Sequence, residues 1–403
     1  MSTGISQSST STAQLAYLEE TAFGVIPTGT PRKLRFTGES FAFDFTMSES
    51  EEINSTGQVT DAIITDASAT GGFNFHWQYK EYDDFLEALL RSTFSSYGTG
   101  GVKSLSLTFN ATAGTITGTA GDFTGLVAGQ WFSVDGSDSN DGVYRISTLT
   151  TAQITVDDET PLLDDEGPTA SVDISSTRLS IGTDTLRSFC IEKTFTDVEQ
   201  YFMNRGRAIS KMELNFAVGQ ILSGSFDTIG KDEVRDDATQ FDASPDPSET
   251  FGVASSIVGV GTVLVRDSLG ASILDGAYIN SLTLTVDGML REQKALSNQG
   301  AIGIGKGTFS IKATGEIYLV TGSIYDTALS NATVSLAIPV MDTNNNGYVY
   351  ILDNVKLNVP KANAGAKDND TMLNFEATAI APNTATDSMI KIDRFGDSVA
   401  DET

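Results

Sequence analysis

The sequence predicts an all-β protein made of β-sandwich or barrel-like domains, with one short helix on the flank of each larger domain. Gly, Ser and Thr are dense throughout the 403 residues, and this composition suits many short strands joined by turns. Apolar and polar residues alternate in segments 40–45 and 73–79, which is the period of a half-buried strand. A hydrophobic content of 39%, with 22 Phe, is enough to form buried cores.

Segment 81–94, EYDDFLEALLRSTF, has the clearest helical pattern. Its apolar residues fall on one face, acids occupy the first turn, and Arg91 lies near the end. We therefore expect a helix over 81–94. The polar stretch before it, 46–72, contains no Lys or Arg and predicts a long ordered loop that makes contacts.

Segment 97–177 differs in character from its surroundings. Short strand patterns recur there between turn residues, which is typical of a small sandwich or barrel. From 104 to 177 the only basic residue is Arg145, against eleven acids. We expect a separate acidic β-domain. Asp157-Asp158-Glu159 and Asp164-Asp165-Glu166 are interpreted as solvated turns within it.

The regions before and after this domain predict an internal duplication. Five blocks recur in the same order, although β-rich sequences of this composition can also align by chance. The matched pairs are 40–52 with 281–293, 71–75 with 315–319, 81–89 with 324–332, 179–193 with 336–354, and 211–216 with 371–375. The expected organisation is an N-terminal arm (1–32), a first copy (33–96 and 178–235), the inserted acidic domain (97–177), a linker (236–253) and a second copy (254–403).

The charge balance excludes several classes of function. With 25 Lys and Arg against 53 Asp and Glu, the net charge is −28, so we expect neither sequence-specific nucleic-acid binding nor membrane association. The N-terminus has no signal-peptide pattern and no stretch of 18 apolar residues occurs, so we expect a soluble chain made in the cytoplasm. One Cys and one His cannot form a disulfide or a structural zinc site.

The motifs that could carry chemistry are all incomplete. Gly300 to Lys306 fits a phosphate loop, but position 307 is Gly where Ser or Thr is needed. Segment 342–353 resembles a calcium loop, but Asp353 replaces the usual Glu, and an Asn-Gly hairpin turn explains the segment as well. His76 is expected to be a packed or rim residue and Cys190 a buried hydrophobe. No catalytic, cofactor-binding or metal-binding residue is assigned, and we expect no enzymatic activity.

Long collinear strings resemble the phage tail tube protein family of siphophage type. They are AYLEETAFGVIPTGTPRKLRFTGES (16–40) followed by EYDDFLEALLRSTF, then 278–339 and 347–382. The resemblance implies a structural virion protein whose β-domains form rings stacked into a tail tube, the conduit for DNA ejection in a long non-contractile tail. It also implies that the loop 46–72, its counterpart 288–310 and the terminal arm reach the next ring.

The family also implies the partners. Single-domain members form rings of six, whereas a chain with two copies can give a trimer with pseudo-six-fold symmetry, which we favour over a hexamer of this chain. The tape measure protein and DNA would occupy the lumen transiently, and tail terminator and distal tail proteins would bind the ends. The inserted domain would decorate the exterior of the tube.

Two other classes of function remain as alternatives from the residues alone. A secreted or surface-exposed adhesion protein of tandem β-domains would carry a signal peptide. A carbohydrate-active β-enzyme would carry aromatic platforms, whereas only two Trp occur.

Overall fold

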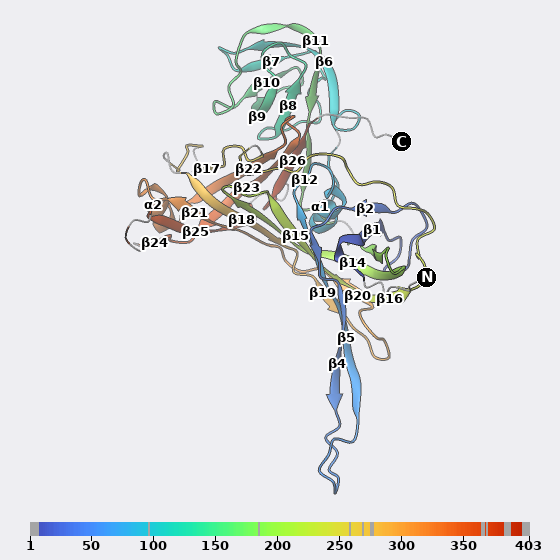
Figure 1. Ribbon diagram of the computed structural model, residues 1–403. Helices are drawn as coiled ribbons and strands as arrows, with labels where there is room; N and C mark the ends of the chain where they lie inside the picture. The colour runs from blue at the N-terminus through green and yellow to red at the C-terminus, as the bar shows by residue number, and fades with distance from the viewer. Residues whose placement is uncertain are drawn as a thin grey trace.

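A computed structural model describes residues 8–95, 97–183, 186–257, 259–267, 270–274, 278–363, 367, 370–382 and 388–396. The chain is predominantly β, as the composition and alternation predict, with two α-helices among the described residues. It forms two lobes that share one large sheet, and a small closed barrel that projects from them (Figure 1). Neither helix within these residues is long and apolar enough to span a membrane.

The first lobe contains the following elements: a 3-10 turn (Thr10–Thr12), β1 (Ala13–Glu19), β2 (Arg32–Leu34), β3 (Gly38–Glu39), β4 (Ala42–Glu49), β5 (Ala62–His76), α1 (Asp83–Leu90), β12 (Thr177–Ser180), β13 (Phe189–Phe195), β14 (Gln200–Ala217), β15 (Ser223–Gly230) and β16 (Asp232–Asp236). All of its sheet pairings are antiparallel, and they run β2–β1–β13–β14–β15–β5–β4.

The barrel is inserted between α1 and β12. It closes in the order β10–β7–β6–β11–β8–β9. Its strands are β6 (Val102–Asn110), β7 (Thr115–Thr117), β8 (Trp131–Asp135), β9 (Gly142–Leu149), β10 (Gln153–Val156) and β11 (Glu166–Ser175). Alternate residues point inward to form a separate apolar core that includes Leu107, Phe132 and Ile154. The recurrence of short strand patterns between turn residues therefore predicts this small β-domain correctly.

The second lobe follows the chain segment after β16. Its elements are β17 (Leu264–Arg266), β18 (Ile279–Asp287), β19 (Arg291–Gln293), β20 (Gly303–Gly305), β21 (Ser310–Tyr318), α2 (Ser323–Leu329), β22 (Thr333–Met341), β23 (Gly347–Leu357), β24 (Lys361–Asn363), β25 (Met372–Ala379) and β26 (Lys391–Phe395). The short hairpin β19–β20 lies in the excursion between β18 and β21.

One continuous core lies beneath both lobes. It joins Phe73, Phe85 and Phe226 of the first lobe to Leu284 and Tyr348 of the second. The two lobes therefore share their largest apolar core.

Three boundaries differ from the expectations. The N-terminal arm includes β1, which pairs with β13 over its whole length and belongs to the sheet. The helix is shorter than 81–94, because Arg91 adopts a left-handed conformation (φ 56°, ψ 44°) and its N–H closes the last turn. The stretch 46–72 is not mainly loop: β4 and β5 extend through it as a hairpin that projects from the body like a finger (Figure 1).

Candidate assembly interface

The two lobes are joined by a strand ladder. The second half of β14 pairs antiparallel with β18, from Lys211 opposite Asp287 to Ala217 opposite Ser281. Alternate residues of this ladder, such as Leu214 and Leu284, are buried in the shared core. The residues between them lie on the other face, where the Thr283 hydroxyl donates a hydrogen bond to Asn215 Oδ1 at 2.9 Å. The sheet therefore has one apolar face and one polar face at this junction.

A buried ion pair also joins the two lobes. Asp83, at the start of α1, accepts hydrogen bonds from Arg394 on β26 and from the Tyr348 hydroxyl on β23. Burial is the largest influence on Asp83 and raises the pKa of its carboxyl, which the charge of Arg394 opposes. Burial and the neighbouring carboxylate of Asp83 raise the pKa of Tyr348 well above its usual value. The Tyr350 hydroxyl accepts from Trp77 Nε1 at 3.3 Å.

Among the strands of this sheet that have one strand partner in the described residues, two lie at matching places of the two lobes. β4 pairs with β5, and β24 pairs with β25. The opposite edge of each strand presents backbone N–H and C=O groups without a strand partner within the described chain. Unpaired edges of this kind are templates for the addition of another chain.

The β4–β5 finger carries exposed apolar side chains near its unpaired edge. Phe45 is 47% exposed and Met47 is 61% exposed. Ile53, in the tip, is fully exposed, and Ile63 and Ile64 on β5 are at least half exposed. Exposure of these apolar side chains to water is unfavourable in a monomer. Such a surface on a projecting hairpin therefore indicates an interaction site.

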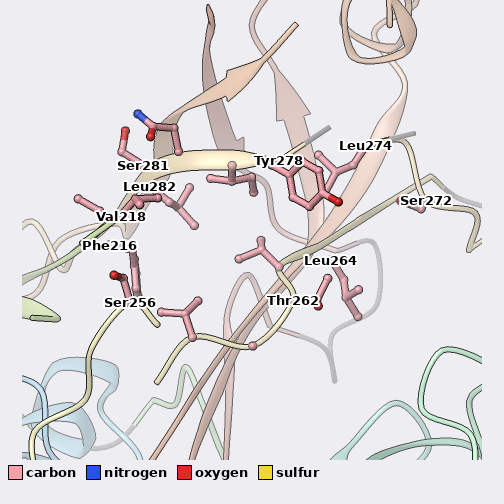
Figure 2. A pocket seen from close by; sticks show the side chains of 16 residues that line it. Phe216, Val218, Ser256, Thr262, Leu264, Ser272, Leu274, Tyr278, Ser281 and Leu282 are labelled. Carbon is pink, nitrogen blue, oxygen red and sulfur yellow. The ribbon is translucent and has the colours of Figure 1, made fainter. Parts of the chain in front are cut away.

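An open groove of 430 Å³ lies at the end of β18 that is opposite the finger. Figure 2 shows its apolar lining, with Phe216 at the end of β14, Val218 just after it, Leu264 from β17, Tyr278 just before β18 and Leu282 within β18. Figure 2 also labels Thr262, Ser256 and Ser272, which contribute hydroxyl groups to the rim. The groove contains no charged side chain among the described residues that line it, so it offers contact area but no acid, base or metal ligand.

The segment that resembles a phosphate loop lies between two strands. Gly303–Gly305 is β20, paired with β19, and the chain continues into β21 with no helix after it. Gly300 would place a Cβ 2.3 Å from the Lys231 carbonyl oxygen, so the glycine here serves a close backbone approach. Lys306 Nζ donates to the Thr183 carbonyl at 3.2 Å. Without a helix N-terminus the segment lacks the anion-binding geometry of a phosphate loop.

The segment that resembles a calcium loop is the turn between β22 and β23. Asp342 Oδ1 accepts from the backbone N–H of Asn344 at 2.7 Å and of Asn346 at 2.9 Å, which closes the turn. Asp353 lies within β23, where it pairs with Lys391. Since β-strands rise about 3.3 Å per residue, Asp353 cannot reach the turn. No cluster of three or more His, Cys, Asp or Glu suited to a metal occurs in the described part of the chain.

The single His and the single Cys do not share a site. His76 ends β5, opposite Ser223 of β15. Cys190 is fully buried on β13, with its Sγ 3.1 Å from Glu20 Oε1. Burial and the Glu20 carboxylate raise the pKa of the Cys190 thiol, so the thiolate, which is the reactive form, is disfavoured.

The acidic turns of the barrel are not simply solvated, contrary to expectation. Asp157 pairs with Arg145 at 2.8 Å and also with Arg266 of the second lobe at 3.1 Å. Glu166 accepts hydrogen bonds from Asn140 Nδ2 at 2.9 Å and from the Thr169 hydroxyl at 2.8 Å. These carboxylates fix loops and contacts, which composition alone could not reveal.

The chain is all-β, has unpaired strand edges and an apolar finger, and assembles no reactive site in its described residues. These features are typical of self-assembling structural proteins. The phage tail tube protein family matches residues 10–379, nearly the whole chain, and the protein belongs to that family. A comparison with curated proteins found no match for this chain.

Membership of this family makes the protein a structural component of the phage tail. It implies assembly of many copies into a tube and a place in the virion, and it implies a role that is not enzymatic.

Proposed function

We propose that three copies of this chain close into a ring of six similar modules, and that stacked rings form the DNA conduit of a long non-contractile tail of siphophage type. The proposal rests on one observation. The two lobes are joined by a ladder between β14 and β18, and the strands that correspond to these two, β24 and β4, each have an unpaired edge. Ring closure would repeat between chains the ladder that already exists within the chain.

The strand neighbours of the two lobes support a duplication. In the first lobe the pairings are β1–β13, β13–β14, β14–β15, β15–β5 and β5–β4. In the second lobe β17–β22, β22–β23, β23–β25, β25–β21 and β21–β18 follow the same pattern. The helices also correspond, since α1 follows β5 and α2 follows β21. Five matching pairings in the same chain order are a stronger argument than sequence blocks.

The register of these pairings aligns the copies residue by residue. Gly71 of β5 corresponds to Gly315 of β21, with buried residues at matching positions on either side. Opposite β15, the register of β14 shifts between Ile209 and Lys211. The segment β23–β24, which pairs with β25, contains one extra residue at the position that corresponds to this shift in β14. With the shifts aligned, Lys361 is the equivalent of Lys211. This alignment supports the first three sequence blocks and replaces the last two, because β14 corresponds to β23–β24 and not to β25.

The alignment specifies an inter-chain ladder. Within the chain, Lys211 lies opposite Asp287. Their equivalents are Lys361 on β24 and Thr46 on β4 of the next subunit, so these two residues would pair in the ring. β24 would then gain a partner on its open side, as would β4. Closed rotational symmetry leaves no edge of this kind unpaired.

The exposed apolar residues of β4 fit this ladder. Val286, on β18, is 1% exposed because the lobe junction covers it. Its equivalent by the alignment is Phe45, which is 47% exposed in the single chain. Ring closure would bury Phe45 as the lobe junction buries Val286, and burial of a large apolar side chain contributes roughly 1.5–3 kcal/mol.

The polar face of the shared sheet is suited to line the lumen. Helices α1 and α2 pack on the same side as the core, and the barrel and the Phe241 segment cover the opposite face at β1, β13, the first half of β14, β23 and β26 in the described residues. Strand alternation on β4, β5, β14, β15, β18, β21 and β25 puts seven acids on that face: Asp44, Asp66, Glu213, Asp227, Asp287, Glu316 and Glu376. The two lysines there, Lys211 and Lys312, pair with Glu213 and Glu376. A net negative wall would repel the DNA phosphates and let DNA slide without binding.

The ring is tested by mass photometry and negative-stain microscopy of the purified protein. We expect rings whose mass is three times 42.8 kDa, and tubes at higher concentration. A ring of six chains would support the hexamer instead. Phe45→Asp should abolish rings, because the ladder would bury an unpaired charge. Leu163→Asp, at a barrel residue that is 74% exposed, is the matched control and should assemble normally.

The register is tested by a disulfide between subunits. Directly opposed residues on antiparallel strands have Cα atoms about 4.5–5.5 Å apart, within reach of a disulfide. Thr46→Cys combined with Lys361→Cys should therefore give covalent trimers on oxidation. Glu49→Cys with Lys361→Cys displaces the first thiol by about 10 Å and should not cross-link. Rings that form without the first cross-link would refute the register, while a protein that never forms rings would refute the proposed assembly.

A further inference from the structure

We propose that the inserted barrel is the structural cover of the second lobe, required to keep β22, β23 and β26 packed, and is not a detachable decoration. The barrel is inserted between α1 and β12 of the first lobe, yet it also docks against the second lobe through three sets of contacts. This inference does not depend on ring formation.

The first contact is apolar. Trp131, at the start of β8, is 5% exposed and packs in one cluster with Val349, Ile351 and Phe395. These three residues lie on β23 and β26, on the side of the sheet that faces away from the shared core. Without the barrel they would present an apolar patch to water.

The second contact is a buried carboxylate shared between barrel and lobe. Asp393 of β26 is fully buried and accepts a hydrogen bond from the Trp131 backbone N–H at 2.8 Å. Arg178 Nε and Nη2 donate to the same carboxylate at 2.6 and 2.8 Å. Arg178 Nη2 also donates to the Gly129 carbonyl of the barrel at 3.1 Å. Loss of the barrel would leave Asp393 with fewer hydrogen bonds in a buried position, which is unfavourable.

The third contact is ionic. Arg266 on β17 of the second lobe pairs with Asp157 and Glu159, in the loop after β10. The Arg266 side chain is only 9% exposed, so the barrel supplies the charges that allow this guanidinium to be buried. Three chemically different contacts therefore tie the barrel to strands at both sides of the second lobe.

The first lobe has a different cover over the matching strands. On β1, β13 and β14, the residues Ala16, Cys190 and Met203 form a cluster with Phe241, which comes from the segment after β16. That segment is anchored at Glu192, which accepts hydrogen bonds from the Thr239 hydroxyl at 2.7 Å and from the Gln240 N–H at 2.8 Å. Since the matching strands of the second lobe are β17, β22 and β23, Trp131 occupies the role there that Phe241 has in the first lobe.

Hydrogen–deuterium exchange on the full-length chain tests the proposal with a reciprocal pair of variants. Trp131→Ala should raise amide exchange in 347–351 and 391–395 at least about tenfold, while 189–195 stays protected. Phe241→Ala should do the reverse. Leu163→Ala, on the exposed surface of the barrel, is the matched control and should change neither region.

A deletion variant distinguishes a cover from a decoration. Replacement of 97–175 by a short Gly-Ser bridge should leave the second lobe unprotected or the protein insoluble. If the bridged chain is soluble and 347–351 remains as protected as in the full chain, the proposal is wrong. If Trp131→Ala does not fold, Arg266→Gln provides the milder test: it should raise exchange at 264–266, and unchanged exchange there would also contradict the proposal.

Discussion

The buried pair between Asp83 and Arg394 offers the sharpest test of how the lobes are held together. Each side chain is 17% exposed, and the two residues come from different lobes. In Asp83→Asn the shape is kept but the countercharge is lost. Among the described residues, the Arg394 side chain would then keep the Thr177 hydroxyl, 3.2 Å from its Nε, and the ring of Phe94, whose centroid lies 4.4 Å away.

The expected cost is large. Removal of one partner from a buried pair costs about 3–5 kcal/mol, and the partial exposure of Arg394 puts this variant near the lower figure. A loss of about 3 kcal/mol raises the unfolded fraction roughly 150-fold. That is a substantial part of the total stability of about 5–15 kcal/mol that is usual for folded proteins.

The assay is guanidinium unfolding of single and double variants, read by fluorescence and circular dichroism. Asp83→Leu combined with Arg394→Met removes both charges and replaces them with apolar groups, and it should lose much less stability than either single variant. If the single and double variants lose the same amount, the pair is well solvated and the argument fails. Coincident transitions from the two probes would show that the lobes unfold together, as the shared core requires.

Three further predictions concern other parts of the molecule. Gly71→Ala should destabilise by more than about 1 kcal/mol and lower the melting temperature, because φ is +102° and a Cβ would lie 2.0 Å from the Ser40 carbonyl oxygen. An unchanged melting temperature would refute the close approach. Arg207→Met should cost about 1–3 kcal/mol and increase proteolysis of the β4–β5 finger, because Arg207 donates to the carbonyls of Thr70 at 2.7 Å and Ala42 at 3.2 Å. Normal resistance to protease would contradict this role. Burial alone would raise the pKa of Asp157, but the hydrogen bond from Arg266 and the nearby charges hold it below its usual value. The stability that this group contributes is therefore present above about pH 4 and lost as the pH falls through the lowered pKa, so the melting-temperature difference between wild type and Asp157→Asn should shrink below about pH 4. A difference that stays constant in acid would exclude the pairing.

Local patterns were enough to predict several elements of the fold. The apolar face of 81–94 predicts α1, since helical periodicity needs only neighbouring residues, although the left-handed Arg91 shortens it. Short strand patterns separated by turn residues in 97–177 predict the barrel, because this signal is also local. The sequence indicates a loop at 46–72 where the structure has a hairpin. The side chains of this hairpin are exposed on both faces, so its polar residues hide the strand alternation around Phe45 and Met47.

The long-range contacts could not be predicted from the sequence. The ladder between β14 and β18 joins residues about seventy positions apart, and no local pattern chooses between partner strands. Likewise, Trp131 starts a barrel strand, yet its side chain packs on β23 and β26 of the second lobe, a contact more than 200 residues away in the chain. The open edges of β4 and β24 are also visible only in the folded sheet, because they depend on which strands do not pair with them in the described chain.

The barrel is inserted in the first lobe, whereas α2 runs into β22 without an insertion at the matching place of the second lobe. A tube built from such chains would carry a protrusion at every second position around its circumference, so its outer surface would have three-fold symmetry while its bore kept six. In the proposed trimer one half of each chain would carry the outer protrusion, and any host factor or neighbouring filament that touches the tail would meet three knobs per layer separated by three bare faces.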